Sequence, residues 1–351
     1  MYERFYGLRD RPFDLTPNPR FLYLTAKHRE ALCTIHYGLS GRKGITLICG
    51  QAGTGKTTLV RAALDALYRP ENRLASLNNP ALTRQEFYEF LASSLRLTER
   101  AALSKARFLV ELEAAVRESR EAGALSALVI DEAQALSTEL LEEVRLLANL
   151  ETPTEKLLPV VLAGQPEVSE RLDEPRWAQL KQRVALRADI SPLDLHDTAA
   201  YVAGRIRIAG GQVPRIFTRD AVVAVFQHSG GIPRVISVIC DNALVTGFAT
   251  GVKPVNSQTV IEVCKDLRLE PVGARPADAL PPETGRLDDP GVRPVPGAES
   301  RGDGRAASAG ADGGAPRPRL LNLVQPPVHE TARGVLFGDH DKVKKRRFLF
   351  F

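Results

Sequence analysis

The sequence contains no hydrophobic run long enough to cross a membrane, and it lacks the apolar stretch of a secretion signal near its start. A membrane-spanning helix needs roughly 18 consecutive apolar residues, and no run in the 351 residues approaches that length. Residues 1–10 mix charged with aromatic side chains, unlike the hydrophobic centre of a signal peptide. These absences predict a cytoplasmic protein.

Cysteine is also scarce. Cys33, Cys49, Cys240 and Cys264 show no paired spacing suited to zinc or to a redox couple, and most of them lie in apolar segments. They are expected to be thiols in a reducing compartment. Hydrophobic residues make up 44% and charged residues 25% of the chain, which is typical of a globular protein of about two domains. The net charge of +5 is too small to indicate nucleic acid or anionic lipid as a partner.

The composition changes near Glu270. Residues 271–319 are dominated by Pro, Gly, Ala, Asp and Arg, and such a segment cannot bury enough apolar surface to offset its ordering entropy. We therefore expect a disordered tail. Its end joins a basic cluster, 342–347, to the apolar residues 348–351, which could contact a membrane or a partner. A solvated charge run with a frayed terminus is the simpler interpretation.

Before Glu270, β-like and helix-like segments alternate, which predicts a parallel sheet with helices on both sides. After residue 192 the expected strands stop and helices follow. The expected domains are 1–192 (α/β nucleotide-binding domain), 193–269 (all-α lid) and 270–351 (tail). The expected strands are 45–49, 73–78, 125–130, 159–163 and 186–190; the expected helices are 58–67, 83–95, 104–120, 137–150, 194–208, 218–228, 232–246 and 256–267.

A phosphate-binding loop pattern, G-x-x-x-x-G-K-[ST], spans residues 50–57 between an expected strand and an expected helix. Glycines let backbone N–H groups turn inward around a polyphosphate, and a helix N-terminus adds its positive dipole end. The alternative is a glycine-rich turn that precedes a helix by chance. The predicted nucleotide-binding residues are Gly50, Gln51, Ala52, Gly53, Thr54, Gly55, Lys56, Thr57 and Thr58.

Two carboxylates follow the expected strand 125–130. Lys56 is expected to reach the β- and γ-phosphates of ATP, and Thr57 and Asp131 to hold Mg²⁺. Glu132 could deprotonate the water that attacks the γ-phosphate. Without a phosphate loop, the same pair would be interpreted as an acidic helix N-cap.

Three further side chains are candidates for contact with the reacting phosphate. Gln165 ends an apolar strand, where an amide could bind the attacking water, although such a residue is more often part of a turn. Arg183 precedes the last strand, and Arg234 follows glycines and a proline at the start of a lid helix. A guanidinium can neutralise developing phosphoryl charge, but most arginines are surface charges.

The motifs in their order resemble AAA+ ATPases of the general secretion pathway protein A type, a group that includes exosortase-associated ATPases of exopolysaccharide loci. The resemblance spans about residues 1–268 and rests on YERFYGL (2–8), RPFDLTPNPRFLYL (11–24), HREAL (28–32), GQAGTGKTT (50–58), NP (79–80), VIDEAQ (129–134), AGQPE (163–167), QR (182–183) and GIPR (231–234).

The resemblance implies roles for individual residues. Asn79 would restrain the catalytic Glu132, and Gln165 would be sensor 1. Arg183 would be an arginine finger that reaches a neighbouring subunit's nucleotide, and Arg234 would be sensor 2. The segment near His28 would pack around the adenine. Many relatives continue into a membrane span and a peptidoglycan-binding domain; the sequence has neither, which favours the exosortase-associated kind.

The expected function is therefore ATP hydrolysis that assembles or regulates a secretion or exopolysaccharide-export system, in a homo-oligomer located peripherally at the inner membrane. The cofactors implied are ATP and Mg²⁺. The alternative is a DNA-binding AAA+ regulator similar to transposition ATPases, for which Arg205, Arg207 and Arg215 would supply phosphate contacts, without a helix-turn-helix reader. A nucleotide-bound scaffold with negligible turnover is a third possibility, and the intact Glu132 argues against it.

Overall fold

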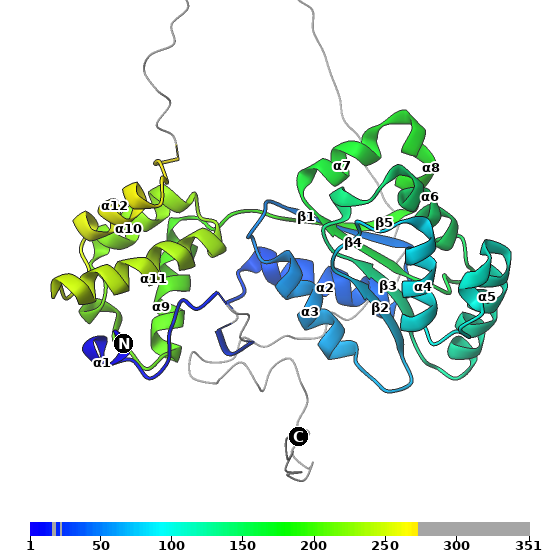
Figure 1. Cartoon of the computed structure of the whole chain (residues 1–351), viewed down its shortest axis with the longest axis horizontal. Coiled ribbons are helices and arrows are strands. Elements are labelled where there is room, and N and C mark those ends of the chain that lie inside the picture. Colours follow the sequence, from blue (N-terminus) through cyan, green and yellow to red (C-terminus); the bar gives the residue numbers. More distant parts are fainter. Residues whose placement is uncertain (16–18, 22, 273–351) are drawn as a thin grey trace, which may run out of the picture. The chain divides into compact units, whose positions relative to one another are not determined.

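A parallel sheet in the strand order β2-β3-β4-β1-β5 lies at the centre of the α/β part of the molecule (Figure 1). The computed structural model describes residues 1–15, 19–21 and 23–272. Each expected strand is present, with ends shifted by at most two residues. The strands are β1 (Ile45–Gly50), β2 (Arg73–Leu77), β3 (Ser126–Ile130), β4 (Val160–Gly164) and β5 (Val184–Ile190).

Side chains alternate between the two faces of each strand, so one strand contributes to two hydrophobic clusters. In β3, Ala127 and Val129 pack in the cluster formed with α2 and α3, whereas Leu128 and Ile130 pack in the cluster formed with α4–α8. Both faces of the sheet are therefore covered by helices, as βαβ connections require. The helices on the first face are α2 (Ala26–Ser40) and α3 (Lys56–Leu67); those of the second cluster are α4 (Arg84–Ser94), α5 (Lys105–Glu121), α6 (Thr138–Leu147), α7 (Pro166–Asp173) and α8 (Ala178–Lys181).

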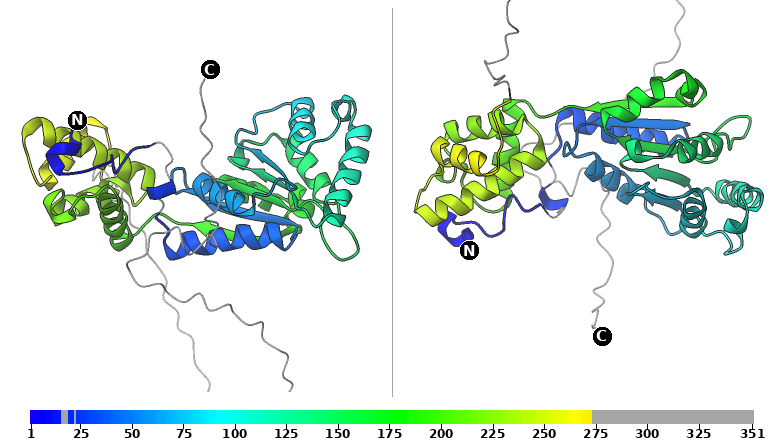
Figure 2. Two further views of the ribbon diagram at one scale, coloured as in Figure 1. Left: turned by 90° about the horizontal axis from the view of Figure 1, so that it is seen from below. Right: turned by 45° about the horizontal axis from the view of Figure 1, so that its top comes forward.

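The helices after residue 192 form a separate hydrophobic cluster, and the N-terminal aromatic residues belong to it. Tyr2 donates a hydrogen bond to Asp241 (2.5 Å), and Phe13 packs edge-on against Phe217. In Figures 1 and 2 the dark blue N-terminal segment runs beside these green and yellow helices. The N-terminal segment thus completes the core of the helical part. The elements are α1 (Glu3–Tyr6), α9 (Leu195–Ile208), α10 (Arg219–Ser229), α11 (Pro233–Thr250) and α12 (Ser257–Asp266), with short 3₁₀ turns at Pro19–Phe21, Ala101–Leu103, Ala133–Ala135, Pro175–Trp177 and Val213–Arg215.

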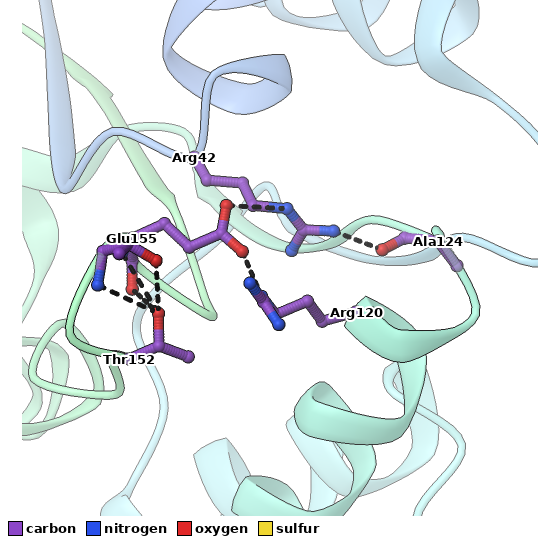
Figure 3. Close-up of polar contacts among 6 residues, drawn as sticks. Arg42, Arg120, Ala124, Thr152 and Glu155 are labelled. Atoms are coloured by element: carbon purple, nitrogen blue, oxygen red, sulfur yellow. Dashed lines mark hydrogen bonds and ion pairs between the residues drawn. The ribbon is translucent and has the colours of Figure 1, made fainter.

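A cluster of ion pairs and hydrogen bonds joins the segments that lead into the N-terminal ends of the strands (Figure 3). The Glu155 carboxylate lies between two guanidinium groups: it pairs with Arg120 and lies 3.9 Å from Nε of Arg42. Arg42 also donates to the carbonyl oxygen of Ala124 (2.6 Å), and the hydroxyl of Thr152 accepts from the Glu155 N–H (3.1 Å). The cluster fixes the chain just before β1 enters the sheet.

The α/β fold with a helical lid is confirmed by this arrangement. The expected tail lies outside the described residues apart from 270–272, as does the basic and apolar terminus at 342–351. The domain limits at 192 and 269 stay predictions. Across the described part of the chain, no helix has the length and apolarity that a bilayer crossing requires.

Candidate functional site

The phosphate loop runs from the end of β1 to the start of α3. Gly53 (φ 80°) and Gly55 (φ 105°) adopt left-handed backbone conformations that side chains with a Cβ rarely accept. A Cβ on Gly53 would also lie 2.9 Å from Cβ of Arg234, so the lid approaches the loop closely there. Gly53 is therefore required both by the turn and by the packing of α11, whereas Gly55 is required by the turn.

The Lys56 ammonium is held at the base of this loop. It is 4% exposed and donates to the carbonyl oxygens of Gly50 (2.8 Å) and Gln51 (3.0 Å). Burial lowers the pKa of Lys56, while the charges of Glu132 and Asp131 act in the opposite direction. Gly50 and Gln51 therefore hold the lysine in place. Gly50, Gln51 and Ala52 do not line the cavity that opens beside the rest of the phosphate loop.

The Thr57 hydroxyl donates to the Asp131 carboxylate at 2.5 Å. Thr57 lies in the first turn of α3, and Asp131 follows the last residue of β3 and is almost fully buried. Two oxygen ligands, one of them an anionic carboxylate, meet beside the phosphate loop. Such a donor set fits Mg²⁺, which prefers oxygen ligands and one or two carboxylates in phosphate sites.

Glu132 lines the same cavity and has an unusual backbone. Its φ of 52° is in the left-handed region, which costs a non-glycine residue about 1 kcal/mol or more and is concentrated at functional sites. Its N–H donates to Asp131 (2.9 Å), and its carboxylate accepts from the amide of Gln134 (2.6 Å). Within one short turn, Asp131 therefore bonds to the Thr57 hydroxyl and Glu132 lines the cavity.

The cavity has a volume of about 550 Å³, which is within the range of small-molecule sites. The phosphate loop, the start of α3, the N-terminal segment and the lid all line it. At the lid, Arg205 donates to Tyr201 (2.7 Å) and Ser237 (2.9 Å), and its guanidinium lies 5.4 Å from the ring centre of Phe21. Its Nε is buried without a hydrogen-bond partner among the described residues.

His28 links the N-terminal segment to the phosphate loop. Its ring is buried, with Nε2 2.9 Å from the carbonyl oxygen of Thr54 and Nδ1 2.7 Å from the hydroxyl of Thr25. A carbonyl oxygen only accepts, so Nε2 carries a hydrogen and donates to it. Sequence reasoning associated this region with adenine but did not identify His28 as a support of the loop.

The lid contacts the loop through the start of α11. The Arg234 N–H donates to the Gly53 carbonyl oxygen (3.3 Å), and Arg234 is among the residues that line the cavity; its role as sensor 2 stays a prediction. Gly231 accepts from the Leu193 N–H (2.8 Å), and a Cβ on Gly231 would lie 1.9 Å from the Leu193 carbonyl oxygen. Only glycine fits at that point of the lid connection.

Three of the six predicted catalytic residues do not line the cavity. Gln165 follows β4, between the ends of β1 and β3, and its N–H donates to the side chain of Gln134 (3.0 Å). Asn79 is exposed and accepts from the Ala81 N–H (3.2 Å). Arg183 precedes β5 at the opposite end of the sheet from the phosphate loop and donates to the Gln179 carbonyl oxygen (2.6 Å). Arg183 is thus remote from the nucleotide cavity of its own chain.

Comparison with known proteins places this geometry in a family. A family model described as an AAA domain matches residues 39–172. General secretion pathway protein A of Aeromonas hydrophila is 41% identical over 252 residues, which are 72% of this chain and 46% of that protein. The chain thus spans about half the length of this relative.

Solved structures share the fold at much lower identity. A crystal structure of Cdc6p from Pyrobaculum aerophilum matches with a TM-score of 0.56 and 19% identity over 73% of this chain and 70% of the other. A Drosophila ORC structure bound to DNA matches with a TM-score of 0.56 and 19% identity over 74% and 65%, respectively. At this identity the likeness establishes the fold alone. The identity to the secretion-pathway relative shows that the chain belongs to the AAA+ ATPases related to general secretion pathway protein A.

Proposed function

We propose that this protein binds ATP with Mg²⁺ and hydrolyses the ATP to ADP and phosphate. The observation that carries the proposal is the meeting of Thr57 and Asp131 beside the phosphate loop, with Glu132 lining the same cavity. A glycine-rich turn that precedes a helix by chance would not require a buried lysine and a buried carboxylate at its mouth.

Binding of the triphosphate falls to the backbone N–H groups of the loop, the N-terminus of α3 and the Lys56 ammonium. Thr57 and Asp131 would hold Mg²⁺, which when bound would supply positive charge to the phosphate oxygens. Phe21, Tyr201 and Arg205, which also line the cavity, would contact the base. The phosphates would thereby meet N–H donors and positive charge, and the base would meet aromatic side chains.

Hydrolysis is assigned to Glu132 as the general base. The oxygen of a water molecule bonds to the γ-phosphorus, the bond from that phosphorus to the bridging oxygen breaks, and one proton of the water passes to the Glu132 carboxylate. Arg234, which lines the cavity from the lid, neutralises negative charge on the phosphates. Gln165 would act as sensor 1 from the end of β4.

The protein acts as a homo-oligomer in this proposal. Because Arg183 lies at the far end of the sheet from its own phosphate loop, its guanidinium is suited to the nucleotide of a neighbouring subunit. ATP then stabilises an interface that weakens when the γ-phosphate is lost. Residues 1–192 would form the nucleotide-binding domain and residues 193–269 the lid.

The machine served is a secretion or exopolysaccharide-export system at the inner membrane, with the protein bound peripherally on the cytoplasmic side. The name of the Aeromonas relative supports a secretion pathway. The exosortase-associated assignment rests on the sequence resemblance. Co-purification of full-length protein with inner-membrane export proteins tests this assignment, and recovery without such proteins would contradict it.

The DNA-binding alternative has less support. The matching Drosophila structure contains DNA, but its likeness to this chain concerns the fold. Arg205, one of the three arginines that would contact phosphates, instead faces the nucleotide cavity. Stimulation of hydrolysis by duplex DNA that weakens with increasing salt would favour this alternative.

The decisive test compares wild-type protein with Lys56→Ala and Glu132→Gln in Mg²⁺ buffer. We expect Lys56→Ala to lose tight ATP binding, and Glu132→Gln to keep binding while phosphate release falls by about 100-fold or more. Lys43→Ala, which removes an exposed lysine near the opposite end of β1, is the matched control and should resemble wild type. Absence of ATP binding by folded wild-type protein would overturn the proposal.

A further inference from the structure

The side chain of Gln134 connects two parts of the site. Its amide nitrogen donates to Oε2 of Glu132 (2.6 Å), and its amide oxygen accepts from the backbone N–H of Gln165 (3.0 Å). The orientation of this amide is determined by its partners. A backbone N–H can only donate, so the amide oxygen must face Gln165 and the NH₂ group must face Glu132.

The surroundings of Gln134 are shaped to admit this side chain. A Cβ on Gly164, the last residue of β4, would lie 2.9 Å from the Gln134 amide oxygen and 3.3 Å from its backbone nitrogen. Side chains two residues apart do not face each other on a helix, yet Glu132 and Gln134 do so here. The left-handed conformation of Glu132 and the 3₁₀ turn Ala133–Ala135 make that contact geometrically possible.

Asn79, the residue expected to restrain Glu132, is used differently. Its side-chain oxygen accepts from the Ala81 N–H two residues later, which is a local turn contact, and the residue is exposed. Among the described residues, the amide that reaches the Glu132 carboxylate is that of Gln134.

We propose that Gln134 positions Glu132: the Gln134 amide holds one oxygen of the Glu132 carboxylate, so that the other oxygen faces the attacking water. This inference rests on the proposed ATP hydrolysis. Because Gln134 is also bonded to the chain at Gln165, it ties the carboxylate to the end of β4, which lies between the phosphate loop and Asp131. Its loss should therefore slow proton abstraction without affecting the groups that bind phosphate.

The test uses the full-length chain with Gln134→Ala, Gln134→Glu and, as the control for the alternative amide, Asn79→Ala. Gln134→Glu retains an acceptor for the Gln165 N–H but replaces the donor to Glu132 with a second carboxylate, which repels the Glu132 carboxylate. Turnover, KM and equilibrium ATP affinity are measured for each. Both Gln134 variants should lose turnover by about 10- to 100-fold while ATP affinity changes less than about threefold, and Asn79→Ala should resemble wild type.

A double-mutant cycle separates positioning from a general structural role. In a Glu132→Gln background, Gln134→Ala should cause no further loss of turnover, because it acts through Glu132. A second loss of full size in that background would overturn the inference, as would wild-type turnover in both Gln134 variants or an equal loss in Asn79→Ala.

The outcome also separates this inference from the proposed function. Wild-type protein that binds no ATP would overturn both. Wild-type protein that hydrolyses ATP, together with Gln134 variants that do so at the same rate, would overturn only the role of Gln134.

Discussion

Replacing His28 with alanine should weaken ATP binding although the residue lies outside the phosphate-loop motif. The ring makes two buried hydrogen bonds, to the Thr54 carbonyl oxygen (2.9 Å) and to the Thr25 hydroxyl (2.7 Å). A buried neutral hydrogen bond contributes about 0.5–1.5 kcal/mol net, so the variant loses roughly 1–3 kcal/mol. If half of this loss falls on the loop conformation that binds phosphate, ATP affinity drops by about 2- to 12-fold.

The measurement is the equilibrium dissociation constant of ATP with Mg²⁺, obtained by titration calorimetry. His28→Gln keeps an N–H donor for the Thr54 carbonyl oxygen and should recover most of the affinity. His36→Ala removes an exposed histidine from the same helix, α2, and should leave affinity unchanged. A His28→Ala protein that binds ATP within about twofold of wild type would refute the reasoning, since the lost bonds would then not support the loop.

Two further predictions concern other parts of the molecule. Arg183→Ala should lower turnover by about 10³-fold or more with little change in ATP affinity. An equimolar mixture of Arg183→Ala and Glu132→Gln proteins should regain activity, because one variant supplies the glutamate and the other supplies the arginine at a shared subunit interface. A mixture without recovery would contradict an arginine finger that acts on a neighbouring subunit. Glu155→Ala should lower the free energy of unfolding by about 2 kcal/mol, because the charge of the largely buried Arg42 then lacks its carboxylate partner. Arg120→Ala removes the more exposed partner of Glu155 and should lower the free energy of unfolding by less than about 1 kcal/mol. Urea unfolding followed by fluorescence of the lone tryptophan, which is buried beside α8, measures both, and equal losses would contradict this ranking.

Much of the fold could be predicted because the buried strands and amphipathic helices have strong hydrophobic patterns. The strand Ser126–Ile130 is buried throughout and apolar after its first residue, and its position was correct to within one residue. The start of β5 was two residues off, since this strand alternates between exposed and buried positions and pairs with β1 alone. Helix α2 was not predicted as an element, because its sequence mixes polar residues among apolar ones.

The candidate site was partly predictable because each motif has its own sequence pattern. Thr57 and Asp131, which are 74 positions apart, meet through a hydrogen bond, and Lys56 donates to the carbonyl oxygen of Gly50; their roles at a nucleotide stay predictions. The role of Gln134 depends on a left-handed turn and on a glycine in another strand, neither of which has a sequence pattern of its own. Hydrophobic periodicity likewise contains no information on strand order or on which distant segment covers the lid.

The contact between Tyr2 and Asp241 has a consequence for biosynthesis. The two residues are 239 positions apart, and at about 5–20 residues per second a ribosome needs roughly ten to fifty seconds to make the intervening chain. During that time the aromatic side chains of the N-terminal segment have been translated but the helices that cover them have not. The newly made chain therefore exposes aromatic side chains, set among charged ones, to which chaperones can bind until α11 and α12 emerge.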